Sequence, residues 1–188
     1  MSGRPWWMAV VALATVAYAS LAPAQVGLDR AGGRQRRPAS DKPATNAKID
    51  DAVKKFTSTE RAERLEGIDQ LAQLGTEAKA VQLLLEAVSD PDAAISIKAI
   101  DALGGMRNQE ATSVLAQRLL LRDQPAMVKQ HLLASLGRIG DPRATSPIVD
   151  LLARSTEPPV RGSAIFALGE IGNRDALPPL ERLAADAT

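Results

Sequence analysis

Residues Val160–Gly172, VRGSAIFALGEIG, decide the fold, because nearly the same line occurs three more times upstream. The other copies are Glu63–Gly75 (ERLEGIDQLAQLG), Ile95–Arg107 (ISIKAIDALGGMR) and Val128–Gly140 (VKQHLLASLGRIG). One leucine in each copy aligns all four, and these leucines lie 32, 33 and 32 residues apart: Leu71, Leu103, Leu136 and Leu168. A fixed period of this size is typical of stacked helical pairs. We therefore predict an all-α fold, a right-handed α-solenoid of four helix pairs with a closing C-terminal helix.

Each unit of the array is predicted to contain a first helix, a short turn and a second helix. The units cover 47–75, 76–107, 108–140 and 141–172, within a repeat domain of 47–188. The first helices are expected at 47–56, 76–88, 108–121 and 141–153. The second helices are expected at 59–74, 91–106, 124–139 and 157–171, and a final helix at 173–185.

Capping residues support these boundaries. The second helices are predicted to start at Ser58, Asp90, Asp123 and Ser155, and the later first helices at Thr76, Asn108, Asp141 and Asn173. Such side chains accept a hydrogen bond from the free N–H groups of a first helical turn. Gly75, Gly140 and Gly172 stand where a helix must end.

The apolar residues of the second helices recur at fixed offsets from the aligned leucine. Three residues before it stand Ile68, Ile100, Leu133 and Ile165, and three after it stand Leu74, Met106, Ile139 and Ile171. Eight residues before it stand Glu63, Ile95, Val128 and Val160. These offsets define one stripe that faces the neighbouring helices. The polar exception, Glu63, predicts an N-terminal unit that tolerates solvent.

The N-terminal residues are predicted to be a secretory signal followed by a tether. Residues 1–24 combine Arg4, an apolar run and the small-x-small cleavage site Ala22-Pro23-Ala24, so we expect export, with the mature protein periplasmic or extracellular. An earlier cut after Ala19 and an uncleaved anchor remain as alternatives. Residues 25–46 are rich in Gly, Pro and Arg and are predicted to be a flexible basic tether.

Composition excludes several kinds of chemistry. The 188-residue chain has no cysteine and a single histidine, which rules out disulfides and thiolate metal sites. The repeat domain 47–188 holds 17 basic and 20 acidic residues, so it is not a polyanion-binding surface. Five aromatic residues in the whole chain are too few for base stacking.

The segments Asp90–Gly104 and Ser155–Gly169, with the pair Val160-Arg161, resemble the HEAT repeat, in particular the short bacterial subclass shared with phycobilisome lyases. The resemblance places the family's basic residue of the second helix on Arg64, Lys129 and Arg161, and its turn aspartate on Asp90 and Asp123. Ser96 departs from the basic column, and Ser58 and Ser155 depart from the aspartate column. The resemblance also implies that the second helices line a concave, ligand-facing wall.

The sequence lacks the motifs of the enzymes that belong to the wider HEAT group. Deoxyhypusine hydroxylases bind iron through repeated His-Glu pairs, whereas His131 is followed by Leu132 and no second histidine exists. HEAT-like DNA glycosylases need a basic groove, and phycobilin lyases act on cytoplasmic partners. We therefore predict that the chain is not an enzyme and has no catalytic residues, cofactor or metal.

The wall is where a partner is expected. Phe166 stands in a column otherwise filled by Asp69, Asp101 and Ala134, so it is either a solvent-facing anchor or local core under the final helix. His131 is either a site residue or a plain exposed histidine. The predicted partner-binding residues are Lys98, Asp101, His131, Arg138, Arg161, Phe166 and Glu170.

These observations predict a non-enzymatic protein–protein interaction scaffold of the cell envelope, which binds a polypeptide partner along the second helices. The alternative is a cell-surface polymer or membrane-surface binder that acts through the basic tether 25–46. No nucleic acid is expected as a partner.

Overall fold

The computed structural model describes residues 42–75 and 77–185, with side chains from Thr45 onwards. This part of the chain holds nine α-helices and no strand. The helices are α2 (Lys42–Phe56), α3 (Arg61–Gln73), α4 (Ala78–Ala87), α5 (Ala93–Gly105), α6 (Ala111–Leu119), α7 (Ala126–Ile139), α8 (Thr145–Arg154), α9 (Pro158–Ile171) and α10 (Leu177–Ala185). Two short 3₁₀ turns, η1 (Pro142–Ala144) and η2 (Arg174–Ala176), lead into α8 and α10. The predicted all-α solenoid is confirmed.

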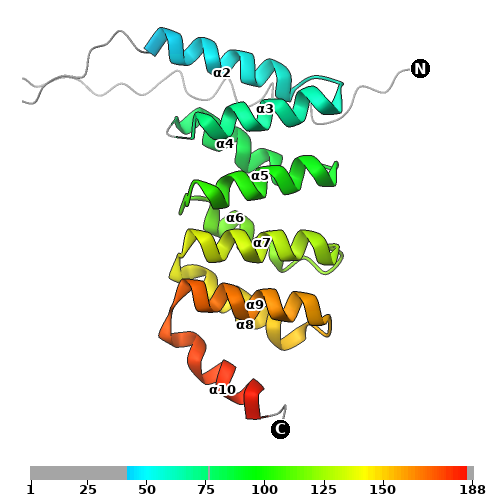
Figure 1. Ribbon diagram of the computed structural model, residues 1–188, viewed down its shortest axis with the longest axis vertical. Coiled ribbons are helices and arrows are strands. Elements are labelled where there is room, and N and C mark those ends of the chain that lie inside the picture. The colour runs from blue at the N-terminus through cyan, green and yellow to red at the C-terminus, as the bar shows by residue number, and fades with distance from the viewer. Residues whose placement is uncertain (1–41, 76, 186–188) are drawn as a thin grey trace, which may run out of the picture. The chain divides into compact units, whose positions relative to one another are not determined.

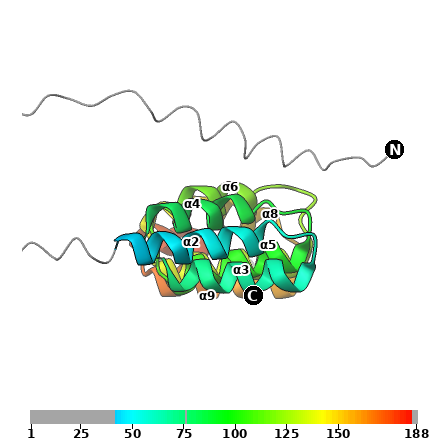
Figure 2. The same cartoon turned by 90° about the horizontal axis from the view of Figure 1, so that it is seen from above.

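The helices form two layers. The second helices α3, α5, α7 and α9 stack in one layer, and α4, α6 and α8 stack in the other (Figures 1 and 2). Helix α2 covers α3 at the N-terminal end of the stack, and α10 lies at the opposite end (Figure 1). Each second helix therefore packs against its own first helix, and α5 and α7 also pack against the second helices before and after them.

The predicted stripe forms the core. All four aligned leucines are buried. Ile68, Ile100 and Leu133, each of which stands three positions before its leucine, are fully buried as well. Their equivalent in the last unit, Ile165, is 48% exposed because no further second helix follows in the described residues. Glu63, the polar exception in the stripe, is exposed as predicted.

Adjacent second helices approach closely at one position, the residue after the aligned leucine. A Cβ added to Gly104 of α5 would lie 2.8 Å from the Cα of Ser135 in α7. One added to Gly137 of α7 would lie 3.2 Å from the Cα of Ala167 in α9. Glycine at this position lets the helix backbones come together without a steric clash.

The helices start later than the capping residues predicted. Six of these residues accept a hydrogen bond from the backbone N–H two residues further on: Ser58, Asp90, Asn108, Asp141, Ser155 and Asn173. Asp141 and Asn173 cap the two 3₁₀ turns. The others precede the helix because they close a local turn before it, so α3 begins at Arg61 and α5 at Ala93. Thr76 lies outside the described residues.

The helix ends follow the glycine prediction at two units. Gly140 and Gly172 adopt left-handed backbone with φ of 72° and 67°. The same position in the second unit holds Arg107, the one non-glycine residue with positive φ in the described chain, at 51°. An L side chain is strained in this region of backbone space.

The N-terminal predictions are tested only in part. Helix α2 begins at Lys42, five residues before the predicted start, so residues 42–46 are helical and do not belong to a tether. The signal peptide 1–24 and the rest of the tether lie outside the described residues. Within the described residues, no helix combines the length and apolar character that crossing a membrane requires.

Candidate functional site

The candidate site is the outward face of the second helices, called the wall below. Residues five before, two before and two after each aligned leucine share this face, because these offsets differ by three or four residues along a helix. The wall consists of Glu66, Asp69 and Gln73 on α3, Lys98, Asp101 and Gly105 on α5, His131, Ala134 and Arg138 on α7, and Ser163, Phe166 and Glu170 on α9.

Ion pairs between neighbouring helices occupy the first three units of the wall. Lys98 Nζ lies 2.7 Å from Asp69 Oδ2. Asp101 accepts from two residues of α7: His131 Nδ1 lies 2.9 Å from Oδ2, and Arg138 Nη2 lies 3.0 Å from Oδ1. The structure thus joins three predicted site residues, Asp101, His131 and Arg138, to one another, and it joins a fourth, Lys98, to Asp69. The first group ties α5 to α7, and the second ties α3 to α5.

The last unit of the wall is different, because it has an exposed aromatic side chain and no ion pair to a neighbouring helix among the described residues. Phe166 is 66% exposed, so the structure selects the solvent-facing alternative for this side chain. A shallow hollow of about 260 Å³ is lined by Ala134, Gly162, Ser163 and Phe166. Glu170, one turn further along α9, is exposed and makes no ion pair with any described residue.

Met127 extends the wall and was missed in the sequence. It lies four residues before His131 on α7, on the same helix face, and is 61% exposed. The equivalent residues of the other units are Ala62, Ala94 and Pro159. The four-residue spacing from His131 could have revealed it. Met127 and Phe166 are thus the two large exposed apolar side chains of the wall.

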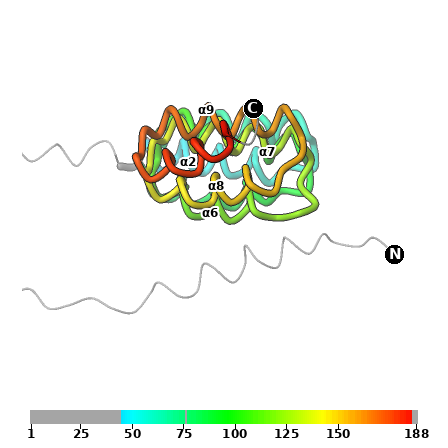
Figure 3. The backbone as a smooth tube through the Cα atoms, turned by 90° about the horizontal axis from the view of Figure 1, so that it is seen from below, coloured from blue at the N-terminus to red at the C-terminus, as the bar shows by residue number. Residues whose placement is uncertain are grey.

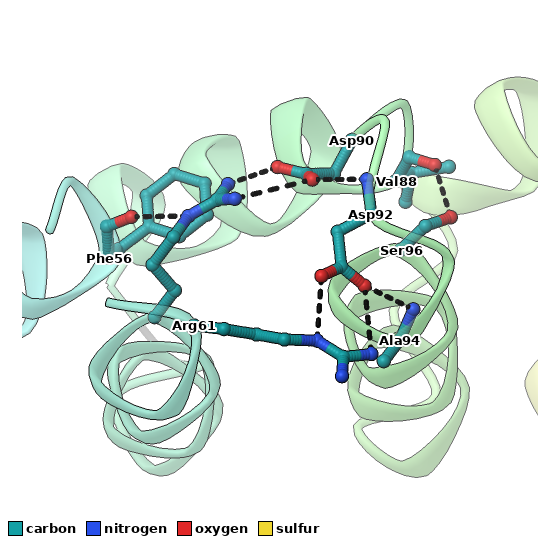
Figure 4. Close-up of polar contacts among 8 residues, drawn as sticks. Phe56, Arg61, Val88, Asp90, Asp92, Ala94 and Ser96 are labelled. Carbon is teal, nitrogen blue, oxygen red and sulfur yellow. Dashed lines mark hydrogen bonds and ion pairs between the residues drawn. The ribbon is translucent and has the colours of Figure 1, made fainter. Parts of the chain in front are cut away.

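Arg161 was predicted as a site residue but lies away from the wall. Its Nη1 donates to the backbone carbonyls of Leu152, at 3.0 Å, and Ser155, at 3.2 Å. The equivalent residue Arg64 also donates to the carbonyl of Phe56, the last residue of α2. Ser96 donates to the carbonyl of Val88, which follows α4 (Figure 4). Three of the four residues in this column, Arg64, Ser96 and Arg161, therefore cap the C-terminal ends of first helices.

Two ion pairs join this basic column to the next unit. Arg64 pairs with the turn residue Asp90, and Lys129 Nζ lies 3.2 Å from Glu157 Oε1. Figure 4 shows Asp90 and Asp92 side by side in the α4–α5 turn, where Arg61 Nε lies 2.7 Å from Asp92 Oδ2. These contacts lie at the turns and stabilise the stack.

Two turn carboxylates have lowered pKa values for structural reasons. Burial raises the pKa of Asp92, but hydrogen bonds from the Ala94 N–H and from Arg61 outweigh this effect and hold the pKa below its usual value. The Arg143 side chain is the main cause that lowers the pKa of Asp141 to about 2, with help from the Arg143 N–H and from Thr112. Both groups therefore fix turns, and neither faces the wall.

The described residues do not fit a metal site. Among them no three His, Cys, Asp or Glu side chains come together in a way that could hold an ion. His131 is the single histidine of the sequence, and its Nδ1 is engaged by Asp101. The His-Glu pairs of a deoxyhypusine hydroxylase therefore have no counterpart in this part of the chain.

The class of protein that this fold and wall define is an α-solenoid repeat protein. The sequence pattern of HEAT repeats matches residues 49–120 and 118–188, which together make up most of the chain. The chain belongs to the HEAT repeat family.

Two relatives of the chain are both deoxyhypusine hydroxylases. A segment of 90 residues is 36% identical to deoxyhypusine hydroxylase of Rattus norvegicus, a match that covers 47% of this chain and 29% of the rat protein. The solved structure of human deoxyhypusine hydroxylase in complex with glycerol is similar with a TM-score of 0.59 and 21% identity, over 80% of this chain and 50% of that chain. The structural likeness shows the fold alone. The chain spans half or less of each relative.

These relatives correct two predictions. The similarity to an enzyme contradicts the predicted non-enzymatic envelope scaffold and its alternative, a surface-binding tether. It also contradicts the prediction that the chain is not an enzyme. The prediction that the chain is not an enzyme relied on the missing His-Glu pairs, on the slightly acidic repeat domain and on the expected export.

Proposed function

We propose that the chain belongs to a protein-modifying enzyme related to deoxyhypusine hydroxylase and that its wall holds the polypeptide substrate. Two kinds of support lead to this proposal: the 36% identical segment of the rat enzyme and the properties of the wall. The single observation that carries the role is the exposed Phe166, which stands on a face where large apolar side chains are otherwise rare.

The substrate segment is proposed to be basic. Glu170 is the wall carboxylate of the last unit and has no cationic partner among the described residues, whereas Asp69 is paired with Lys98 and Asp101 with Arg138. A Lys or Arg side chain over the Phe166 ring would gain a cation–π contact and could reach Glu170. The hollow beside Phe166 leaves room for such a side chain.

Met127 supports a polypeptide as the ligand. Exposed methionine and aromatic side chains are enriched in protein interfaces, and methionine adapts to different neighbours. Met127 and Phe166 lie on adjacent second helices of the wall, α7 and α9. An extended segment that crosses from α7 to α9 would contact both.

No chemical step is assigned to the described residues. They do not fit an iron site, so a hydroxylation reaction would require metal ligands from outside residues 42–75 and 77–185. The role proposed here is substrate binding, and binding is therefore the quantity to measure.

The test is fluorescence anisotropy of the full chain with two labelled peptides of equal length, one lysine-rich and one glutamate-rich. We expect the lysine-rich peptide to bind. Phe166→Ala should weaken that binding by roughly 5- to 30-fold, the loss of about 1–2 kcal/mol for an interface anchor. Glu170→Gln should weaken it less.

The matched control is Leu121→Ala. Leu121 is also a large apolar side chain, 55% exposed, but it lies in the α6–α7 turn and outside the wall. Its truncation should leave the affinity unchanged. Equal binding of both peptides, or equal losses in the Phe166 and Leu121 variants, would show that the wall does not hold a basic polypeptide.

Export and the short bacterial subclass remain proposals. The small-x-small site Ala22-Pro23-Ala24 after an apolar run supports cleavage before Gln25. N-terminal sequencing of the protein purified from its natural source tests this, with Gln25 as the expected first residue.

A further inference from the structure

A second polar site lies away from the wall, at the edge of the stack where first helices end and second helices begin (Figures 1 and 3). A pocket of about 370 Å³ opens there between the α6–α7 turn and the α8–α9 turn, and we call it the turn pocket. Its volume is within the range of pockets that hold small ligands. The polar part of its lining consists of Arg122, Lys129, Arg154, Ser155, Thr156 and Glu157.

The two arginines of the turn pocket occupy the same position in successive repeats. Arg122 and Arg154 each stand 14 residues before the aligned leucine of their unit. The first two units have Thr57 and Ser89 at this position. Because stacked helices lie about 8–10 Å apart, equivalent side chains of neighbouring repeats are close enough to contact one ligand. The repeat therefore places two guanidinium groups at one pocket.

Neither arginine has a carboxylate partner among the described residues. Arg122 is exposed, and its side chain makes no hydrogen bond or ion pair within this part of the chain. Arg154 Nε donates to the backbone carbonyl of Asp150 at 2.9 Å, and its two Nη groups have no partner there. A guanidinium group carries five N–H donors in a planar fork that fits the oxygens of an anion. The unused donors point to an anionic ligand.

The α8–α9 turn lacks the aspartate that pairs with the equivalent cation earlier in the stack. Arg64 pairs with Asp90 in the α4–α5 turn (Figure 4). The equivalent of Asp90 in the α8–α9 turn is Ser155, and Lys129, the equivalent of Arg64, pairs with Glu157 instead, at 3.2 Å. This pair uses the one carboxylate that lines the turn pocket. The lining therefore carries three positive side chains and one negative side chain, a net charge of +2.

The helix ends at this edge do not reverse the sign of that charge. Helices α6 and α8 end here and α7 and α9 begin here, so their partial charges of about one half each largely cancel. Arg161 also donates to two carbonyls at the end of α8, those of Leu152 and Ser155. Asp123 of the α6–α7 turn is exposed and does not line the turn pocket. The side chains thus make the pocket electropositive.

We propose that the turn pocket binds a phosphate monoester, either a small organic phosphate or a phosphorylated serine or threonine of a polypeptide. Such a group carries a charge of about −1.5 to −2 at pH 7, which matches the lining. Its three terminal oxygens can accept from both guanidinium groups and from the hydroxyls of Ser155 and Thr156. The apolar part of the ligand would contact the leucines of the lining, Leu119–Leu121 and Leu151.

The test is fluorescence anisotropy of the full chain with three labelled peptides that differ at one place, which holds phosphoserine, serine or glutamate. We expect the phosphoserine peptide to bind at least about tenfold more tightly than the others, because glutamate has a single charge and two acceptor oxygens. The affinity should fall as the salt concentration rises.

Competition distinguishes the two sources of the phosphate. Unlabelled phosphoserine peptide and glycerol phosphate are titrated against the bound labelled peptide. Equal displacement by both would show that the phosphate group alone is recognised, as expected for a small organic phosphate. Displacement by the peptide at much lower concentration would assign a phosphorylated polypeptide, whose chain adds contacts of its own.

Arg122→Ser and Arg154→Thr test the two arginines one at a time. Both variants should fold, because serine and threonine occupy this position in the first two units. Each should weaken binding of the phosphoserine peptide at least about tenfold, the loss of a charge-assisted contact. The matched control is Arg107→Gln, which removes one positive charge at the opposite end of the second helices. Its affinity should stay within about twofold of the parent chain.

The turn pocket can be tested separately from the wall. Phe166→Ala should leave the affinity for the phosphoserine peptide unchanged, and Arg122→Ser should leave the affinity for the lysine-rich peptide unchanged, because the two sites share no residue. The phosphate site is wrong if the phosphoserine, serine and glutamate peptides bind alike, or if Arg107→Gln loses as much affinity as Arg122→Ser. Either result would leave the proposed role of the wall intact.

Discussion

Gly104 and Gly169 occupy the same position in their helices, one residue after the aligned leucine, yet only Gly104 is packed. A Cβ on Gly104 would lie 2.5 Å from the Oγ and 2.8 Å from the Cα of Ser135. Gly169 has only open space around it. The requirement for glycine thus comes from the neighbouring second helix and not from the helix that carries the glycine.

Replacing glycine by alanine should have opposite effects on stability at Gly104 and at Gly169. Gly104→Ala should lower the free energy of unfolding by about 1–3 kcal/mol, because the backbone of α7 has to move. Gly169→Ala should raise it by up to about 1 kcal/mol, because alanine favours the helix and meets nothing. Urea denaturation of dilute, monomeric protein measures both. Equal changes in the two variants would contradict the close approach of α5 and α7.

Arg107 should be replaceable by glycine with a gain in stability. It occupies the position at which Gly140 and Gly172 end their helices, and its φ of 51° is strained for an L residue. Arg107→Gly is expected to raise the free energy of unfolding by about 0.5–1 kcal/mol. Gly140→Ala is the converse control and should lower it by about 1 kcal/mol. Thermal melts of the two variants should shift in opposite directions.

Asp141 should make the fold sensitive to acid. Its side chain is 6% exposed and accepts hydrogen bonds from Arg143 Nε at 2.8 Å and Thr112 Oγ1 at 3.0 Å. Its pKa is about 2 in the folded protein and 3.8 as an ordinary aspartate. A lowered pKa stabilises the fold above pH 4, and this contribution is lost as the pH falls through about 2.

The contribution of Asp141 is expected to be about 1–2 kcal/mol, since solvent screens its partner Arg143, which is 65% exposed. Asp141→Asn should remove it at neutral pH. The stability of this variant should therefore fall less than that of the parent chain between pH 4 and pH 2. Parallel stability curves over this range would show that Asp141 is not the responsible group.

Asp101 should couple α5 to α7 through the wall. It accepts from both His131 and Arg138, and all three side chains are partly exposed. A double-mutant cycle of Asp101→Ala and Arg138→Ala should give a coupling energy of about 0.5 kcal/mol, typical of an exposed ion pair. The coupling should shrink at high salt. A cycle of Asp101→Ala with Arg182→Ala on α10 serves as the uncoupled control.

The helical architecture was predictable because its signals are local or periodic. The 32-residue repeat, the buried stripe and the terminal Gly140 and Gly172 all appear in the structure. The starts of α3 and α5 were predicted two residues early because Ser58 and Asp90 cap the turn before the helix. The start of α2 at Lys42 was missed because residues 42–46 lack an apolar stripe.

The wall was predictable as a face but not in its detail. The helical offsets predicted that Lys98, Asp101, His131, Arg138 and Phe166 share one helix face, and their role in binding stays a prediction. The same offsets could not show that Asp101 is shared by two cations or that Phe166 stays open. Arg161 was misassigned to the wall, because its side chain reaches back to the carbonyls that end α8.

The sequence alone determined the repeat, the order of the helices and the face that each turns to the core, since a 3.6-residue period and a 32-residue period are properties of the chain. The tertiary structure decided which equivalent positions of the repeats differ in their burial. Gly104 is packed and Gly169 is open, and Leu133 is buried and Ile165 is exposed, because a residue's burial depends on the helix that stacks against it. That neighbour exists only in three dimensions.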